Sequence, residues 1–182
     1  EISIETHLTF PRQWGLGTSS TLINNIAQWA QVDPYELLKL TFGGSGYDIA
    51  CAQLDTPLTY RLIKDSRIIE TVDFDPDFKD SLYFVYLNKK QNSRDAIDAY
   101  RKITSDQSES IRVINAITKN IIDCKTLLEF ESLITKHEQI ISKIIKQQPI
   151  KEGLFSDFKG AIKSLGAWGG DFVLATAKEN PS

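Results

Sequence analysis

A turn rich in glycine and hydroxyl side chains, at residues 11–23, is the part of the chain best suited to chemistry. Its two glycines, Gly15 and Gly17, are followed by four hydroxyl residues, Thr18 to Thr21. Apolar residues alternate with polar ones before it, which predicts a strand at residues 2–10. After it, apolar residues recur with helical spacing, which predicts a helix over residues 22–30. A glycine-rich turn that leads into a helix presents free N–H groups with a partial positive charge, so this turn is expected to bind a phosphate.

A strand-to-helix turn without any ligand is the alternative, because Gly-x-Gly before a helix is common. The turn is not a Walker loop, since no Lys follows Gly17. Two further glycine-rich segments lie downstream, at residues 42–52 and 163–173. Three such segments in one chain favour ligand binding over a purely structural turn.

In order and composition, the three segments resemble the motifs of the GHMP kinases, the superfamily of galactokinase, homoserine kinase, mevalonate kinase and phosphomevalonate kinase. Gly15–Ser19 is similar to the Gly-Leu-Gly-Ser-Ser nucleotide loop of that family, with Thr in place of the first Ser. Gly44–Ala50 is similar to the segment that carries the acidic active-site residue, and Gly166–Asp171 to the loop that closes over the phosphates. The resemblance covers nearly the whole chain.

The resemblance implies ATP and Mg²⁺ as cofactors. Ser19 and Glu36 would bind the metal, and Asp48 would accept or orient the proton of the acceptor hydroxyl. The implied nucleotide loop consists of Gly15, Leu16, Gly17, Thr18, Ser19 and Ser20. The residues implied to contact the acceptor or the transferred phosphate are Ser45, Gly46, Gly166, Ala167, Gly169, Gly170 and Asp171.

Each of these roles has a structural alternative. Thr18 or Ser19 would cap the first helix, and Asp48 would cap a later one. Glu36 is favoured as part of a capping box, in which Asp33 is the N-cap and Glu36 reaches back to it. The third segment would be a tight turn between a helix and a strand, although such a turn needs only one glycine.

A cationic segment follows a predicted strand in the second half of the chain. It contains Lys89, Lys90, Ser93 and Arg94, which would suit an anionic acceptor at a strand-to-helix junction. A solvated surface turn is the other interpretation.

Within the family, the second and third segments are most similar to the phosphomevalonate and mevalonate kinase branch. The expected reaction is therefore transfer of the ATP γ-phosphoryl group to phosphomevalonate or mevalonate, with homoserine or a sugar as alternative acceptors. Trp168 replaces a loop glycine and is expected to restrict φ there and to narrow the pocket. The first motif of the family is missing, so we expect this chain to lack the N-terminal part of a longer protein; a catalytically silent sensor is the alternative outside the enzymes.

The resemblance implies an α+β fold, with a partial ribosomal protein S5-like nucleotide domain at residues 1–76 and a ferredoxin-like domain at residues 77–182. Strands are predicted at Leu58–Ile63, Arg67–Val72 and Leu82–Leu87, and the domain boundary within residues 73–80. Residues 93–148 have helical spacing with breaks near Ser105 and Asp123, which indicates helices packed on a sheet.

Composition narrows the class of protein. The chain has 182 residues, of which 41% are hydrophobic, enough for a substantial core. Its net charge of −3 and pI of about 5.4 argue against a general nucleic-acid binder, which would usually show a basic face. No apolar run reaches the roughly 18 residues of a membrane span.

The remaining candidate residues favour a cytoplasmic protein. Cys51 and Cys124 are expected as packed thiols in a reducing cytoplasm, with a disulfide as the minor alternative. His137 is expected at the rim of a helix, and neither it nor His7 has the neighbours of a metal centre.

A small-molecule acceptor is the expected partner, and homodimer formation is left open.

Overall fold

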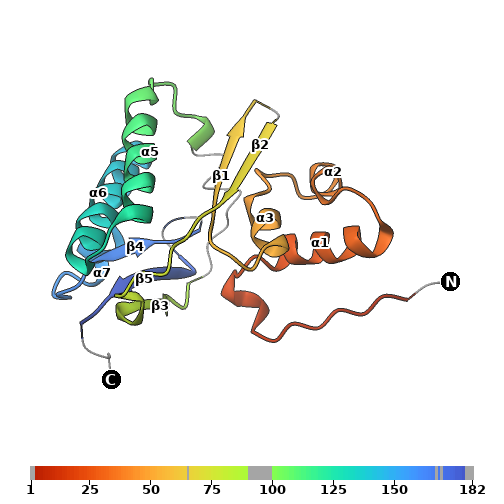
Figure 1. Ribbon diagram of the computed structural model, residues 1–182, viewed down its shortest axis with the longest axis horizontal. Helices are drawn as coiled ribbons and strands as arrows, with labels where there is room; N and C mark the ends of the chain where they lie inside the picture. The colour runs from red at the N-terminus through yellow and green to blue at the C-terminus, as the bar shows by residue number, and fades with distance from the viewer. Residues whose placement is uncertain (1–2, 65, 90–99, 167, 169, 179–182) are drawn as a thin grey trace. The chain divides into compact units, whose positions relative to one another are not determined.

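The computed structural model describes residues 3–64, 66–89, 100–166, 168 and 170–178. It is of the α+β class and divides into two compact units, Glu1–Phe74 and Asp75–Ser182 (Figure 1). The division lies inside residues 73–80, the segment in which the sequence places a boundary. None of the described helices has the length and apolar content needed to cross a bilayer.

The first unit is built on a long helix, α1, and a β-hairpin. Its short helices α2 and α3 both contact α1, and α3 also contacts β1. The buried apolar residues Ile23, Leu38 and Ile49 come one from each helix and form the core of the unit. The elements are η1 Arg12–Trp14, α1 Thr18–Ala30, α2 Pro34–Leu40, α3 Tyr47–Gln53, β1 Leu58–Ile63 and β2 Ser66–Thr71.

The segment before the first loop is not a strand, so that prediction is wrong. Residues 3–8 belong to no helix or strand, and Ile4 and Leu8 are exposed. Alternation supplies one apolar face, but a strand also needs a neighbour that accepts and donates its backbone hydrogen bonds. In the described part of this unit, β1 and β2 pair with each other alone, in an antiparallel hairpin.

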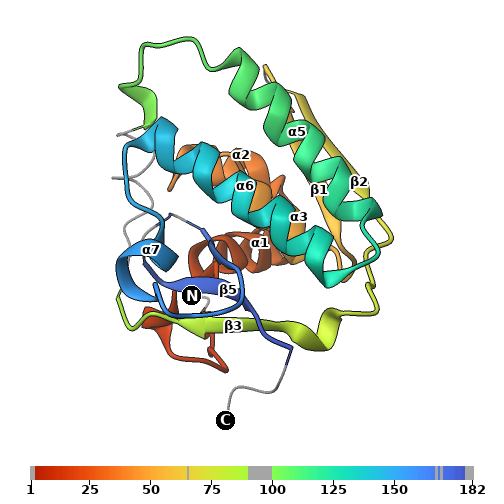
Figure 2. The same ribbon diagram turned by 90° about the vertical axis from the view of Figure 1, so that its left-hand side faces the viewer.

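The second unit packs a helical hairpin on a three-stranded sheet. The strand order is β3-β5-β4, and both pairings are antiparallel. Helix α6 contacts β4, and α5 lies alongside α6 (Figure 2). The elements are η2 Lys79–Ser81, β3 Leu82–Tyr86, α5 Ser108–Asp123, α6 Leu127–Ile145, α7 Ile150–Leu154, β4 Ile162–Ser164 and β5 Phe172–Thr176.

The strands predicted at Leu58–Ile63, Arg67–Val72 and Leu82–Leu87, and the two helix breaks, are confirmed to within two residues. The second break has a clear local cause. Thr126 accepts a hydrogen bond from the Glu129 N–H, and the Glu129 carboxylate accepts one from the Thr126 N–H, so a complete capping box starts α6. Behind this start, Phe130 and Ile134 turn the apolar face of α6 inward, where both are buried.

The third glycine-rich segment connects two strands, so the alternative of a helix-to-strand turn is wrong. Strands β4 and β5 pair antiparallel, and the Leu165 N–H donates to the Phe172 carbonyl at 3.1 Å. The segment is therefore the loop of a β-hairpin. Strand β4 has three residues, which is too short a run for alternation to be recognised.

Candidate functional site

The first loop has the backbone conformation that an anion-binding turn needs. Gly15 and Gly17 both have left-handed φ, +71° and +67°. Gly17 is the N-cap of α1 and no side chain caps the helix, so the interpretation that Thr18 or Ser19 does so is wrong. Both residues lie inside the first turn instead, where the backbone N–H groups of Thr18 to Ser20 have no acceptor within the helix.

The space beside this loop is open. A Cβ atom added at Gly17 would meet no atom within 4 Å, so packing does not explain the glycine. The Ser19 side chain is exposed on the first turn. Helix N-termini favour negative charge, and this one offers both unsatisfied N–H groups and room for a ligand.

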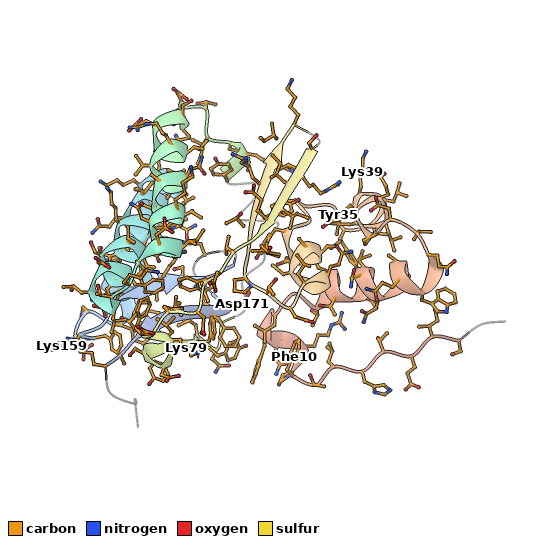
Figure 3. All side chains as sticks on the ribbon, viewed as in Figure 1. Phe10, Tyr35, Lys39, Lys79, Lys159 and Asp171 are labelled. Carbon is orange, nitrogen blue, oxygen red and sulfur yellow. The ribbon has the colours of Figure 1, made fainter. Side chains whose placement is uncertain are left out.

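The second loop is held in place by aromatic side chains. Gly46 is the N-cap of α3, and its own Cβ would lie 2.8 Å from Cδ1 of Tyr35, so close packing requires this glycine. The Tyr60 hydroxyl donates a hydrogen bond to the Ser45 carbonyl. The Arg67 guanidinium lies over the Tyr35 ring, 4.3 Å from its centre, in a cation–π contact. Tyr35 is labelled in Figure 3.

Asp48 lies in the first turn of α3 and is half-buried. It does not cap the helix, because Gly46 is the N-cap and no side-chain cap bond is made there. Burial raises the pKa of Asp48, and a hydrogen bond with the Tyr47 phenol partly offsets this. A carboxylate with a raised pKa is a stronger base, which suits proton transfer.

The two expected metal ligands come from neighbouring helices. Ser19 is on α1 and Glu36 is on α2, which contacts α1. Asp33 caps α2 as predicted, accepting from the N–H groups of Tyr35 and Glu36. The Glu36 side chain is exposed and makes no bond back to Asp33, so the predicted capping box is wrong. Among the described residues, no three Asp, Glu, His or Cys side chains gather around one point. Mg²⁺ commonly takes one or two protein oxygen ligands together with phosphate oxygens. The Ser19 hydroxyl and the Glu36 carboxylate are ligands of that chemical type.

The third loop, in the second unit, is tied to the end of β3. The Asp171 N–H donates to the Lys89 carbonyl at 2.6 Å, and its carbonyl accepts from the Leu87 N–H at 2.8 Å (Figure 3 labels Asp171). Two residues expected to contact the acceptor, Lys89 and Asp171, are therefore adjacent. Gly166 has a φ of +58°, and a Cβ there would meet nothing within 4 Å, as at Gly17.

Trp168 does not restrict φ as expected. It adopts the left-handed conformation itself, with φ +58°, at a typical cost of about 1–2 kcal/mol for a non-glycine residue. Its side chain is 7% exposed, so it is buried in its own unit. The indole N–H donates to the Glu138 carboxylate at 3.2 Å.

Glu138 is a residue that sequence reasoning missed. It lies on α6, is 3% exposed, and also accepts hydrogen bonds from the Ser164 N–H at 3.1 Å and hydroxyl at 2.6 Å. Its position in the sequence could have identified it, because Glu138 lies on an apolar helical stripe, four residues after Ile134 and three before Ile141. A charge in such a stripe needs buried partners.

Two basic side chains accompany this buried carboxylate. Lys163 donates to the Ser164 carbonyl at 2.9 Å; burial lowers its pKa, and Glu138 acts in the opposite direction. Burial and then the nearby Lys163 lower the pKa of His137 to about 4, so His137 is neutral at pH 7. Its intermediate exposure agrees with the rim position expected from the sequence.

Some expected site residues lie outside the described residues. These are Lys90, Ser93, Arg94, Ala167 and Gly169. Cys51 and Cys124 are free thiols. Cys51 is exposed, so the expectation that both thiols are packed is wrong for this residue.

Comparisons of the chain with protein-family models, with curated proteins and with solved structures found no match. Function is therefore argued from the residues and their geometry.

Proposed function

We propose that this chain is part of an ATP-dependent small-molecule kinase of the GHMP type. The observation that carries the proposal is the first loop: two left-handed glycines, an α1 N-terminus without a side-chain cap, and open space beside Gly17. The proposal includes an S5-like nucleotide domain and a ferredoxin-like second domain for the two α+β units. It also includes a cytoplasmic location, with which the free thiols Cys51 and Cys124 agree.

The residues of the first unit have complementary roles in this proposal. Backbone N–H groups of the first loop hold the phosphates, while Ser19 and Glu36 supply oxygen ligands to the metal. When bound, ATP supplies the phosphoryl group and Mg²⁺ neutralises its charge. Asp48 accepts or orients the proton of an acceptor hydroxyl; for a phosphate acceptor, already ionised, it instead positions cationic groups.

The proposed acceptor is small and anionic, with phosphomevalonate or mevalonate as the first candidates. Lys89 and the neighbouring cations Lys90 and Arg94 supply the charge that such an acceptor requires. Asp171, whose backbone is bonded to that of Lys89, would orient these cations.

The test is Mg²⁺-dependent release of ADP by the full-length protein, with mevalonate, phosphomevalonate, homoserine and galactose offered in parallel. Asp48→Asn is compared with Asp55→Asn, the same substitution at an exposed residue just after α3. For a hydroxyl acceptor, we expect Asp48→Asn to lower kcat about 100- to 10,000-fold and Asp55→Asn to leave it unchanged.

Two results would contradict the proposal. The first is an absence of both ATP binding and ADP release. The second is ATP binding that persists without any acceptor-dependent turnover, which would favour a nucleotide sensor. An equal decrease in kcat for Asp48→Asn and Asp55→Asn would show that Asp48 has no specific part in the reaction.

A further inference from the structure

The segment that joins α2 to α3 depends on its neighbours for its conformation. Three of its residues, Gly43, Gly44 and Gly46, are glycines with left-handed φ of +67°, +111° and +85°. Glycine has more backbone freedom than any other residue, so a segment with three of them does little to fix itself. Its start is tied to α2, because the Gly43 N–H donates to the Leu38 carbonyl at 2.7 Å. Its end, next to α3, needs a support of its own.

A phenol from the β-hairpin supports that end. The Tyr60 hydroxyl, on β1, donates a hydrogen bond to the carbonyl of Ser45, the residue just before the N-cap of α3. The same phenol oxygen lies 3.6 Å from the position that a Cβ on Gly46 would take, so it also packs beside the N-cap. Tyr60 and Ser45 are 15 residues apart, and their bond ties the segment to the hairpin.

The ring of Tyr35 lies against the same N-cap. A Cβ on Gly46 would be 2.8 Å from Cδ1 and 3.0 Å from Cε1 of Tyr35, so the ring is in direct contact with the glycine backbone. The phenol oxygen of Tyr35 is buried, and among the described residues it has no hydrogen-bond partner. The two tyrosines therefore differ in kind, because only the hydroxyl of Tyr60 is bonded to the segment.

The position of the N-cap determines the position of Asp48, two residues further on. The Gly46 carbonyl accepts from the N–H groups of Ile49 at 3.1 Å and Ala50 at 3.2 Å, so the turn that contains Asp48 is bonded directly to the N-cap residue. Ile49 and Ala50 are buried and hold the back of α3 in the core. A residue that transfers a proton must lie within hydrogen-bond reach of it, so a displacement of about 1 Å is enough to slow a reaction.

We propose that Tyr60 is a positioning residue, which acts through the Ser45 carbonyl and Gly46 to fix the first turn of α3 and with it the carboxylate of Asp48. This inference rests on the proposed kinase function and names a residue outside the three glycine-rich segments. Every group in it belongs to the first unit. Tyr60 does not touch the reacting atoms; it sets the place of the residue that does.

Tyr35 provides the matched control. Tyr35→Phe removes the same kind of phenol oxygen from the same cluster, but this oxygen makes no hydrogen bond and has no part in the proposed support. The ring that packs against Gly46 and contacts the Arg67 guanidinium is retained. Tyr60→Phe also keeps its ring and removes only the hydroxyl that is bonded to Ser45.

The first experiment measures the support without any catalysis. Amide hydrogen exchange, followed by NMR in the full-length protein, reports how often the first turn of α3 opens at the N–H groups of Ile49 and Ala50. We expect Tyr60→Phe to speed exchange at these two amides about 3- to 10-fold, as the loss of one ordinary hydrogen bond would. Tyr35→Phe should leave both rates unchanged.

The second experiment tests whether Tyr60 acts through Asp48. In the ADP-release assay, we expect Tyr60→Phe to lower kcat about 5- to 30-fold with little change in the KM for ATP. In an Asp48→Asn background, the same substitution should change kcat less than about 2-fold, because no carboxylate is left to position. Tyr35→Phe should keep kcat in both backgrounds.

The outcomes separate this inference from the proposed function. If the unaltered protein releases ADP and Tyr60→Phe keeps its kcat, or lowers kcat equally with and without Asp48, the inference on Tyr60 is overturned and the kinase function stands. If the unaltered protein releases no ADP with any acceptor, the role of Tyr60 in catalysis falls together with the proposed function. Equal exchange rates in Tyr60→Phe and Tyr35→Phe would overturn the support itself.

Discussion

Replacing Gly17 by alanine separates the cost of a strained backbone from the loss of a ligand contact. Gly17 has φ +67°, and a Cβ there would meet nothing within 4 Å. The folding cost of Gly17→Ala therefore comes from the left-handed conformation alone, about 1–2 kcal/mol. In a unit of this size, each kcal/mol lowers the melting temperature by about 4–8 °C.

Gly43 offers an equivalent site away from the first loop. It also has φ +67° and open space around its Cβ position, and it lies between α2 and α3. Gly43→Ala should therefore cost the same folding free energy. Only Gly17→Ala adds a methyl group beside the N–H groups proposed to hold phosphate, so only this variant should weaken ATP binding beyond the effect of stability.

The expected loss follows from one charge-assisted hydrogen bond, worth about 1.5–3 kcal/mol. The dissociation constant for Mg·ATP should then rise about 10- to 150-fold in Gly17→Ala and stay unchanged in Gly43→Ala. Isothermal titration calorimetry of the full-length protein, well below the melting temperature of each variant, measures this difference. Equal affinities in the two variants would refute the assignment of the first loop to phosphate.

Three further predictions concern stability. Gly160→Ala should destabilise the second unit by about 3 kcal/mol or more, measured by urea unfolding, because its Cβ would lie 1.7 Å from the Thr176 carbonyl oxygen. Thr126→Ala should cost about 1 kcal/mol in the same assay through loss of the α6 cap, and Thr126→Ser should cost much less. Because burial and Lys163 lower the folded-state pKa of His137 from 6.5 to about 4, the unfolded chain binds the proton more readily, and stability should fall as the pH drops through this window. After discounting for partial exposure, the free energy of unfolding should fall by about 2 kcal/mol over this pH range. Melting curves measured across the same range should not show this fall for His137→Phe.

Local patterns in the sequence were sufficient for most of the elements. The hairpin strands β1 and β2 and the first strand of the second unit, β3, were predicted from β-branched and aromatic runs between turns. The Asp33 cap was predicted from the Asp-Pro pair at the start of α2. In these cases the determining interactions are within a few residues of each other.

Predictions that depended on distant partners were less successful. The segment at residues 2–10 has the alternation of a strand, but alternation does not tell whether a neighbouring strand is present. The conformation of Trp168 was also mistaken, since its left-handed φ is held by Glu138, thirty residues away in sequence. The candidate site divides in the same way: the conformation of the first loop is local, whereas the support of the third loop is not.

The two glutamates on α6 fix how that helix sits on its sheet. Glu131 bonds to β5 and Glu138 to β4, about two helical turns further along. Apolar side chains alone would tolerate a shift of α6 by one turn, about 5.4 Å, because similar residues recur at that spacing. Such a shift would leave both carboxylates without their hydroxyl partners, Ser164 and Thr176. The two hydrogen bonds therefore favour one position of α6 along the sheet over positions shifted by a helical turn.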